Sequence, residues 1–248
     1  MFKHFALLLL VVVTLFAGDF QKGMEAYKHG DYKSALDLWR TLAQKNNNQA
    51  AENNLGYMYS RGKGVKQDYK EAVKWYTRAA KQGFAEAQNN LGLMYSSGKG
   101  VKKNYKEAVK WYRRAAKQGN AKAQFNLAIM YTEGKGVKRD YNEVLALYKH
   151  SAEQGYAAAQ YNLGSLYAFG KGVRKNSAEA VKWYKLAAKQ GYSLAQYNLG
   201  NMYVFGEGVP KDKRKAYQWW LAAAKQGEKD AQTNLDILCQ QSPWACKQ

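Results

Sequence analysis

A segment of 36 residues recurs five times along this chain of 248 residues, and this repeat constrains the fold more than any other feature. Its most similar part reads NNLGYMY, NNLGLMY, FNLAIMY, YNLGSLY and YNLGNMY, starting at residues 53, 89, 125, 161 and 197. Tryptophan keeps the same period, with leucine in one of the five places: Trp75, Trp111, Leu147, Trp183 and Trp219. A fixed period of this length is typical of proteins built from stacked structural repeats.

Each copy contains two helical patterns. In the second copy, Ala87, Leu91 and Tyr95 share one helix face, and 21 residues later Ala108, Tyr112 and their neighbours form another. Four Asx residues precede a glutamate by three positions, a spacing typical of helix N-caps. These pairs are Asp68/Glu71, Asn104/Glu107, Asp140/Glu143 and Asn176/Glu179. We therefore expect two helices in each repeat.

A Gly-x-Gly motif lies between the two helices of each copy. Gly98 and Gly100 could cradle a phosphate, as in a P-loop, or could let the chain turn sharply. A P-loop needs a longer glycine motif that leads directly into a helix, whereas here the next helix begins about four residues later. The motif recurs in all five copies, which favours a turn.

A single helix pair cannot bury residues such as Leu91, Trp111 and Tyr112, but stacked pairs can. The sequence therefore predicts an all-α fold, a right-handed α/α solenoid of stacked 36-residue helix-turn-helix repeats. We expect a capping helix pair at residues 18–49, five repeats over 50–229 and a capping helix with a closed tail over 230–248.

The first 17 residues have the pattern of a cleaved secretory signal peptide. Lys3 precedes the apolar stretch from Phe5 to Phe16, and the small residues Ala17 and Gly18 follow. A membrane anchor is the alternative, but a span needs about 20 apolar residues. We expect a bacterial periplasmic or secreted protein.

The chain is strongly basic, with a formal net charge of +20 that falls to +19 when residues 1–17 are removed. The basic residues recur evenly and no nucleic-acid-binding motif is present, so we expect no nucleic-acid partner. In an exported protein the charge is explained first by a solvated surface that keeps the protein soluble, and alternatively by binding of an anionic envelope glycan or an acidic protein.

Cys239 and Cys246 lie near the end of the chain. In an exported protein this pair is expected to form a disulfide. Only His29 and His150 remain as histidines after signal cleavage, so we expect no metal site and no cofactor.

The repeat pattern A-x-x-N-L-G-x-M-Y-x-x-G-x-G-V resembles the Sel-one-like repeat, a relative of the tetratricopeptide repeat. The resemblance covers about residues 50–238, and residues 20–45 are closer to a tetratricopeptide unit. It implies a scaffold for protein assembly. One cysteine-rich, secreted branch of the family is described as β-lactam-binding or β-lactam-hydrolysing. This chain has no cysteine near Ala80 or Gln88, where that branch has its pairs.

A hydrolase of the β-lactamase type is the alternative to a scaffold. Ser60 and Ser96 each precede a lysine by three positions, as in the S-x-x-K motif of serine β-lactamases. The equivalent positions hold Thr132, Ala168 and Val204, and the motifs S-D-N and K-T-G are absent. We therefore predict no catalytic residues.

A binding surface is predicted beside the packing face of the first helices. By resemblance to tetratricopeptide arrays, a column of asparagines lines a concave groove: Asn54, Asn90, Asn126, Asn162 and Asn198. Each amide could hold a peptide backbone or could bond within the stack.

The residues beside this column become aromatic in the C-terminal half: Phe125, Tyr161, Phe169, Tyr197 and Phe205. Aromatic side chains are typical interface anchors, although some could instead fill gaps between repeats. We expect a monomer that binds a protein or peptide on this face.

Overall fold

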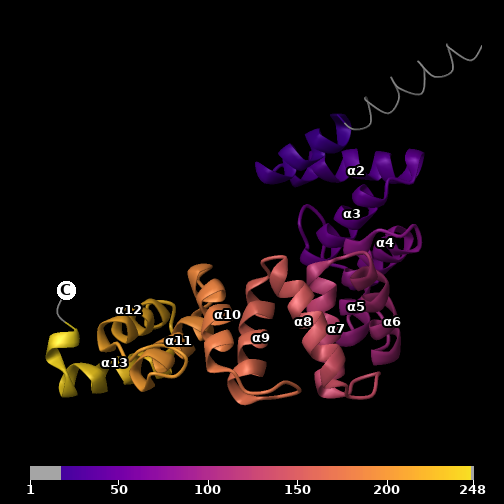
Figure 1. Ribbon diagram of the computed structural model, residues 1–248. Helices are drawn as coiled ribbons and strands as arrows, with labels where there is room; N and C mark the ends of the chain where they lie inside the picture. Colours follow the sequence, from indigo (N-terminus) through magenta and orange to yellow (C-terminus); the bar gives the residue numbers. More distant parts are fainter. Residues whose placement is uncertain (1–17, 247–248) are drawn as a thin grey trace, which may run out of the picture. The chain divides into compact units, whose positions relative to one another are not determined.

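The computed structural model describes residues 18–246, and in this range every regular element is a helix. The chain divides into two compact units, Met1–Asn120 and Ala121–Gln248 (Figure 1). The predicted all-α fold of helix-turn-helix repeats is confirmed. The predicted signal peptide, residues 1–17, lies outside the described residues.

The first unit begins with a helix over residues 18–28. Five further helices follow in chain order: α2 (Tyr32–Asn46), α3 (Gln49–Arg61), α4 (Tyr69–Lys81), α5 (Ala85–Ser97) and α6 (Tyr105–Lys117). The pairs α3/α4 and α5/α6 are the first two repeats.

The second unit holds the remaining three repeats and the C-terminal helix. Its elements are α7 (Ala121–Glu133), α8 (Tyr141–Glu153), α9 (Ala157–Phe169), α10 (Ser177–Lys189), α11 (Ser193–Phe205), α12 (Lys213–Ala224), α13 (Lys229–Gln241) and the 3₁₀ turn η1 (Pro243–Ala245). None of the helices in residues 18–246 is long and apolar enough to cross a bilayer.

The two helices of a repeat approach each other at a glycine. A Cβ atom added to Gly92 in α5 would lie 2.6 Å from the Tyr112 ring of α6, closer than side-chain carbons come in proteins. Gly56 and Tyr76 meet in the same way in α3 and α4. In these repeats the glycine of the N-L-G segment lets the two helices approach this closely, whereas the third repeat has Ala128 in its place.

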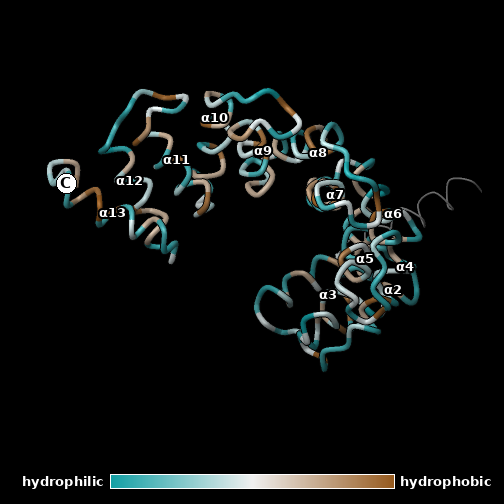
Figure 2. Tube along the Cα trace, turned by 90° about the horizontal axis from the view of Figure 1, so that it is seen from below, coloured by the Kyte–Doolittle hydropathy of each residue, from teal (hydrophilic) through white to brown (hydrophobic). Residues whose placement is uncertain are grey.

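The apolar cores lie between consecutive repeats. One core joins Tyr76 of α4 to Leu91 of α5 and Trp111 of α6, and another joins Tyr148 of α8 to Leu163 of α9. Hydrophobic and hydrophilic positions alternate along the helices that supply these cores (Figure 2). Each repeat therefore completes the core of its neighbour.

The Gly-x-Gly motif is a turn, as the sequence predicts. Gly98 caps α5 with a φ of 76°, and its N–H donates to the Met94 carbonyl oxygen at 2.8 Å. Gly100 has a φ of 71° and lies directly against the first residue of α4, so an added Cβ would overlap the Tyr69 carbonyl oxygen. The second glycine thus lets the turn rest on the preceding repeat.

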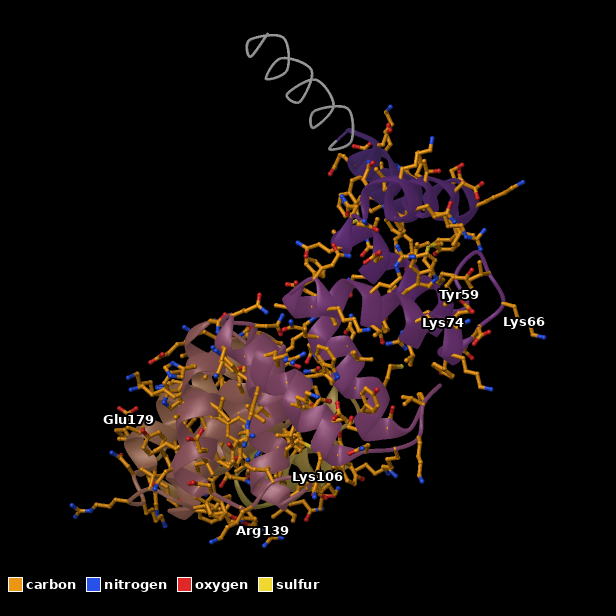
Figure 3. All side chains as sticks on the ribbon, turned by 90° about the vertical axis from the view of Figure 1, so that its right-hand side faces the viewer. Tyr59, Lys66, Lys74, Lys106, Arg139 and Glu179 are labelled. Atoms are coloured by element: carbon orange, nitrogen blue, oxygen red, sulfur yellow. A yellow bond between two sulfur atoms is a disulfide. The ribbon has the colours of Figure 1, made fainter. Side chains whose placement is uncertain are left out.

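Asx side chains cap the second helices, as predicted. The Asp68 carboxylate accepts from the backbone N–H groups of Lys70 and Glu71 at the start of α4. Asp212 caps α12 in the same way, although no glutamate follows three positions later. Basic side chains extend from the ribbon around these helices, Lys66 among them (Figure 3).

Cys239 of α13 lies opposite Cys246 after η1, with a Cα–Cα distance of 5.7 Å and disulfide geometry. The turn between them carries Trp244, which is half exposed and lies beside Arg214 of α12. Formation of this disulfide in the cell stays a prediction.

A column of buried glutamines joins consecutive repeats, and the sequence analysis missed it. Gln88 of α5 donates to the Ala80 carbonyl oxygen of the preceding repeat at 3.2 Å and accepts from Gln118 of its own repeat at 2.8 Å. The same pairing recurs at Gln124/Gln154, Gln160/Gln190 and Gln196/Gln226. These bonds satisfy polar groups inside an apolar interface.

The first repeat replaces this glutamine by Glu52, which is fully buried. Its carboxylate accepts from Arg78 Nε at 2.8 Å and from Gln82 Nε2 at 2.6 Å. Burial raises the pKa of Glu52, although Arg78 and Gln82 act in the opposite direction.

We predict that Gly100→Ala destabilises the protein far more than Gly119→Ala. Both glycines have positive φ, so both alanines incur a backbone cost of about 1–2 kcal/mol. Gly119 has open space around it, whereas Gly100 lies against Tyr69, which adds about 1–3 kcal/mol of overpacking. Urea unfolding followed by circular dichroism measures the difference. Equal losses for the two variants would contradict the role assigned to the second glycine.

We also predict that Glu52→Gln changes how stability depends on pH. A carboxyl whose pKa is raised in the folded state favours folding when protonated, and this contribution is lost as pH rises above its usual value of 4.5. The free energy of unfolding of the wild type, relative to that of Glu52→Gln, should therefore fall as the pH rises from about 4 towards neutral. A difference that stays constant over this range would show that Glu52 does not titrate as described.

Candidate functional site

A groove of about 330 Å³ lies at the junction of α7, α8 and α9 in the second unit. Three helices and the turn after α9 supply its walls. The lining residues are Thr132, Tyr141, Tyr148, Tyr161, Asn162, Ser165, Leu166, Phe169 and Lys171. Aromatic rings, hydroxyl groups, an amide and an ammonium group therefore converge in one place.

A smaller groove of about 160 Å³ occupies the same place in the first unit, between α3, α4 and α5. Its lining residues are Tyr57, Ser60, Arg61, Tyr69, Tyr76, Asn90, Leu93, Met94 and Lys99. Seven of these lie 72 residues before a lining residue of the other groove, among them Tyr76 and Asn90, which precede Tyr148 and Asn162. The two grooves are thus the same feature, two repeats apart in sequence.

A buried tyrosine forms the floor of each groove. Tyr76 is only 2% exposed, and burial raises its pKa to about 12. Burial also raises the pKa of Tyr148, against hydrogen bonds from Thr132 and Asn162. Both phenols therefore stay protonated at neutral pH, so each can donate a hydrogen bond to a bound group.

Several asparagines of the predicted column bond to neighbouring repeats. Asn90 donates to Asn53 Oδ1 of the preceding repeat at 2.9 Å, and Asn162 bonds to Tyr148. Asn198 of α11 forms the equivalent side-chain hydrogen bond with Tyr184 of α10. These side chains thus help to hold the stack, and their contact with a partner stays a prediction.

Asn54 and Asn126 are the remaining members of the column. Asn54 lies 3.5 Å from Met24 Sδ of the N-terminal helix, and Asn126 occupies the equivalent position of α7. Asn90 and Asn162 are the members that line the two grooves.

The aromatic residues of the predicted surface divide into two groups. Phe125 is half-buried against Tyr148 and Tyr156, and Tyr161 is half-buried against Tyr184 and Tyr192. Tyr197 is half-buried against the core of α10 to α13. These three fill gaps in the stack.

Phe169 and Phe205 are different, being 69% and 64% exposed. Each is the last residue of its helix, immediately before a glycine in the left-handed conformation. The chain reverses there, so the side chain is left on the surface. Phe169 also lines the groove of the second unit, with Lys171 Nζ 5.9 Å from its ring centre.

The two S-x-x-K serines do not have the geometry of nucleophiles. Ser60 Oγ donates to the Tyr57 carbonyl oxygen at 2.8 Å, and Ser96 Oγ donates to the Leu93 carbonyl oxygen at 3.1 Å. Lys99, which follows Ser96, lies over the Tyr69 ring instead. Serine activation needs a base within hydrogen-bond reach.

Among residues 18–246 no three His, Cys, Asp or Glu side chains are grouped closely enough to hold a metal ion. His29 lies in the turn after the N-terminal helix and His150 lies on α8, so these two histidines are in different units.

Sequence reasoning missed much of the two grooves. Tyr69 and Tyr141 are the first residues of α4 and α8, and Lys99 and Lys171 lie in Gly-Lys-Gly turns that were interpreted only as corners. A signal was present, because tyrosine recurs at residues 69, 105 and 141 and lysine at 63, 99, 135 and 171.

Comparisons with solved structures found close similarity to two repeat proteins. A Sel1 repeat protein from Oxalobacter formigenes is 40% identical with a TM-score of 0.78, over 88% of this chain and 86% of that one. The protein c5321, a protective antigen present in uropathogenic Escherichia coli strains, is 38% identical with a TM-score of 0.84. That match covers 91% of this chain but only 49% of c5321.

The immunity protein Pa5087 from Pseudomonas aeruginosa shares the fold at 20% identity, with a TM-score of 0.56 over 82% of this chain and 81% of that one. No match was found among proteins with curated functions. The Sel1 repeat family matches the chain at five consecutive segments: residues 49–84, 85–120, 121–156, 157–192 and 193–228. The chain therefore belongs to the Sel1 repeat family.

Proposed function

We propose that this protein is an exported, non-catalytic scaffold that binds an extended segment of a partner protein in its repeat-junction grooves. Sel1 repeats generally bind proteins, and the repeats here form a scaffold of that kind. The observation that supports the site most strongly is the recurrence of one groove, with the same tyrosines, asparagine and lysine, in both units.

The chemistry of the grooves suits a peptide. An extended chain presents N–H and C=O groups together with side chains, and each groove offers hydroxyl and amide groups beside aromatic rings. In the second unit, Phe169 provides exposed apolar area at the groove, and aromatic residues often dominate binding energy at interfaces.

Phe169 is a better anchor than Tyr161, although both were predicted for this role. Tyr161 already contacts Tyr184 and Tyr192, so its replacement would disturb the stack. Phe169 can be replaced with little effect on the core, because most of its surface is exposed.

We also propose that the protein is exported from the cytoplasm. Residues 1–17 have the pattern of a signal peptide, and the Cys239–Cys246 geometry suits an oxidising compartment. A periplasmic or extracellular scaffold would meet its partner in the cell envelope.

For binding, we predict that Phe169→Ala lowers retention of the partner about tenfold, as expected when an aromatic anchor is lost. The measurement is quantitative mass spectrometry of proteins captured from the native envelope by the tagged mature chain. Leu186→Ala is the control, because Leu186 is an exposed apolar residue of α10 outside both grooves. Identical captured proteins for both variants and the wild type would contradict the proposal.

For export, we predict that the protein recovered from its native cell begins at Gly18 and lacks two hydrogen atoms relative to the reduced chain. Signal cleavage explains the first change and the Cys239–Cys246 bond explains the second. Intact-mass analysis with and without reduction measures both. An N-terminus at Met1, or cysteines that react with iodoacetamide without reduction, would count against export.

A further inference from the structure

We propose that the groove of the first unit binds a carboxylate of an acidic peptide segment, held by Arg61 and Lys99. The inference rests on the proposed function, because it names the chemistry of the segment that enters one groove.

Two cationic side chains, Arg61 and Lys99, line this groove and have no acidic partner among the residues that the structure describes. Arg61 Cζ lies 5.8 Å from the Tyr57 ring centre, and Lys99 Nζ lies 5.2 Å from the Tyr69 ring centre. Neither forms an ion pair within the part of the chain that the structure describes, and the groove lining contains no Asp or Glu. The rings hold both cations in place while their N–H donors remain available.

The floor of the groove adds a neutral donor. Tyr76 keeps its phenolic proton at neutral pH, and its hydroxyl group makes a long contact of 3.5 Å with Ser60 Oγ. A carboxylate can accept two hydrogen bonds from a guanidinium group and further bonds from an ammonium and a phenol. The lining of this groove therefore supplies donors of three kinds for one anionic group.

The second groove has the opposite charge at the equivalent position. Glu133 lies 72 residues after Arg61, and Lys135 Nζ pairs with it at 2.7 Å. Burial is the main cause of the raised pKa of both floor tyrosines, but Arg61 opposes it at Tyr76 whereas Glu133 adds to it at Tyr148. Arg61 and Glu133 thus shift the pKa of the nearby floor tyrosine in opposite directions.

The change of charge from Arg61 to Glu133 predicts that the two grooves bind different ligands. The first groove attracts a carboxylate through two cations, whereas the second groove is lined by one cation, Lys171, and presents Phe169. The same fold therefore supplies a groove with two cations and a groove with one cation and an exposed aromatic ring, in separate units.

The test uses the mature chain, residues 18–248, and an array of 12-residue peptides of random sequence. Each peptide with an Asp or Glu is paired with a copy that has Asn or Gln instead. We expect the wild type to bind the acidic copies of a subset of peptides about tenfold more tightly, the scale of a charge-assisted hydrogen bond. The preference should weaken as salt rises.

Arg61→Gln combined with Lys99→Gln should abolish this preference, and so should Arg61→Glu, which introduces the residue found 72 positions later in the second unit. Arg61→Lys should retain most of it. Lys70→Gln combined with Lys106→Gln is the matched control, since it removes the same charge from exposed positions outside the groove. Circular dichroism of every variant confirms that the fold is kept.

Equal binding of acidic and amide peptides by the wild type would overturn the inference and leave the proposed function intact. A preference that survives loss of Arg61 and Lys99 would also overturn it, because the acid would then bind elsewhere. Absence of peptide binding by the wild type would overturn both.

Discussion

Each repeat exposes apolar side chains that only the next repeat can cover, and this shared burial is the constraint on which the structure depends. Trp111 is 7% exposed because it packs in one core with Tyr76 and Leu91, which belong to two different repeats. Burial of one large apolar side chain contributes about 1.5–3 kcal/mol. A helix pair of this length has too little core of its own to offset the cost of ordering its backbone.

Shared burial explains the residues that recur with the period of 36. The glycine of the N-L-G segment lets two helices approach, and the second glycine of the turn lets the turn rest on the preceding repeat. The buried glutamines satisfy polar groups at the interface without introducing charge. The grooves are a consequence of the same geometry, since they form where two first helices and one second helix meet.

The sequence was sufficient to predict the helix pairs, the turns and the helix caps, because these depend on local chemistry and a strict period. It was not sufficient for the grooves, because these depend on which side chains converge from three helices. Tyr161 and Phe169 illustrate the limit: both are aromatic and both lie beside the asparagine column, but one packs on Tyr184 and Tyr192 and the other is exposed. The role of Glu52 depends likewise on Arg78, which is 26 residues away.

The most direct test of the stacking claim is the far-ultraviolet circular dichroism of single and joined repeats. The fragment of residues 85–120, which contains α5 and α6, should be largely unfolded in water because its apolar face has no neighbour. The fragment of residues 18–120 should be helical and should melt cooperatively. If the single repeat folds alone with the stability of the longer fragment, burial between repeats does not hold this protein together.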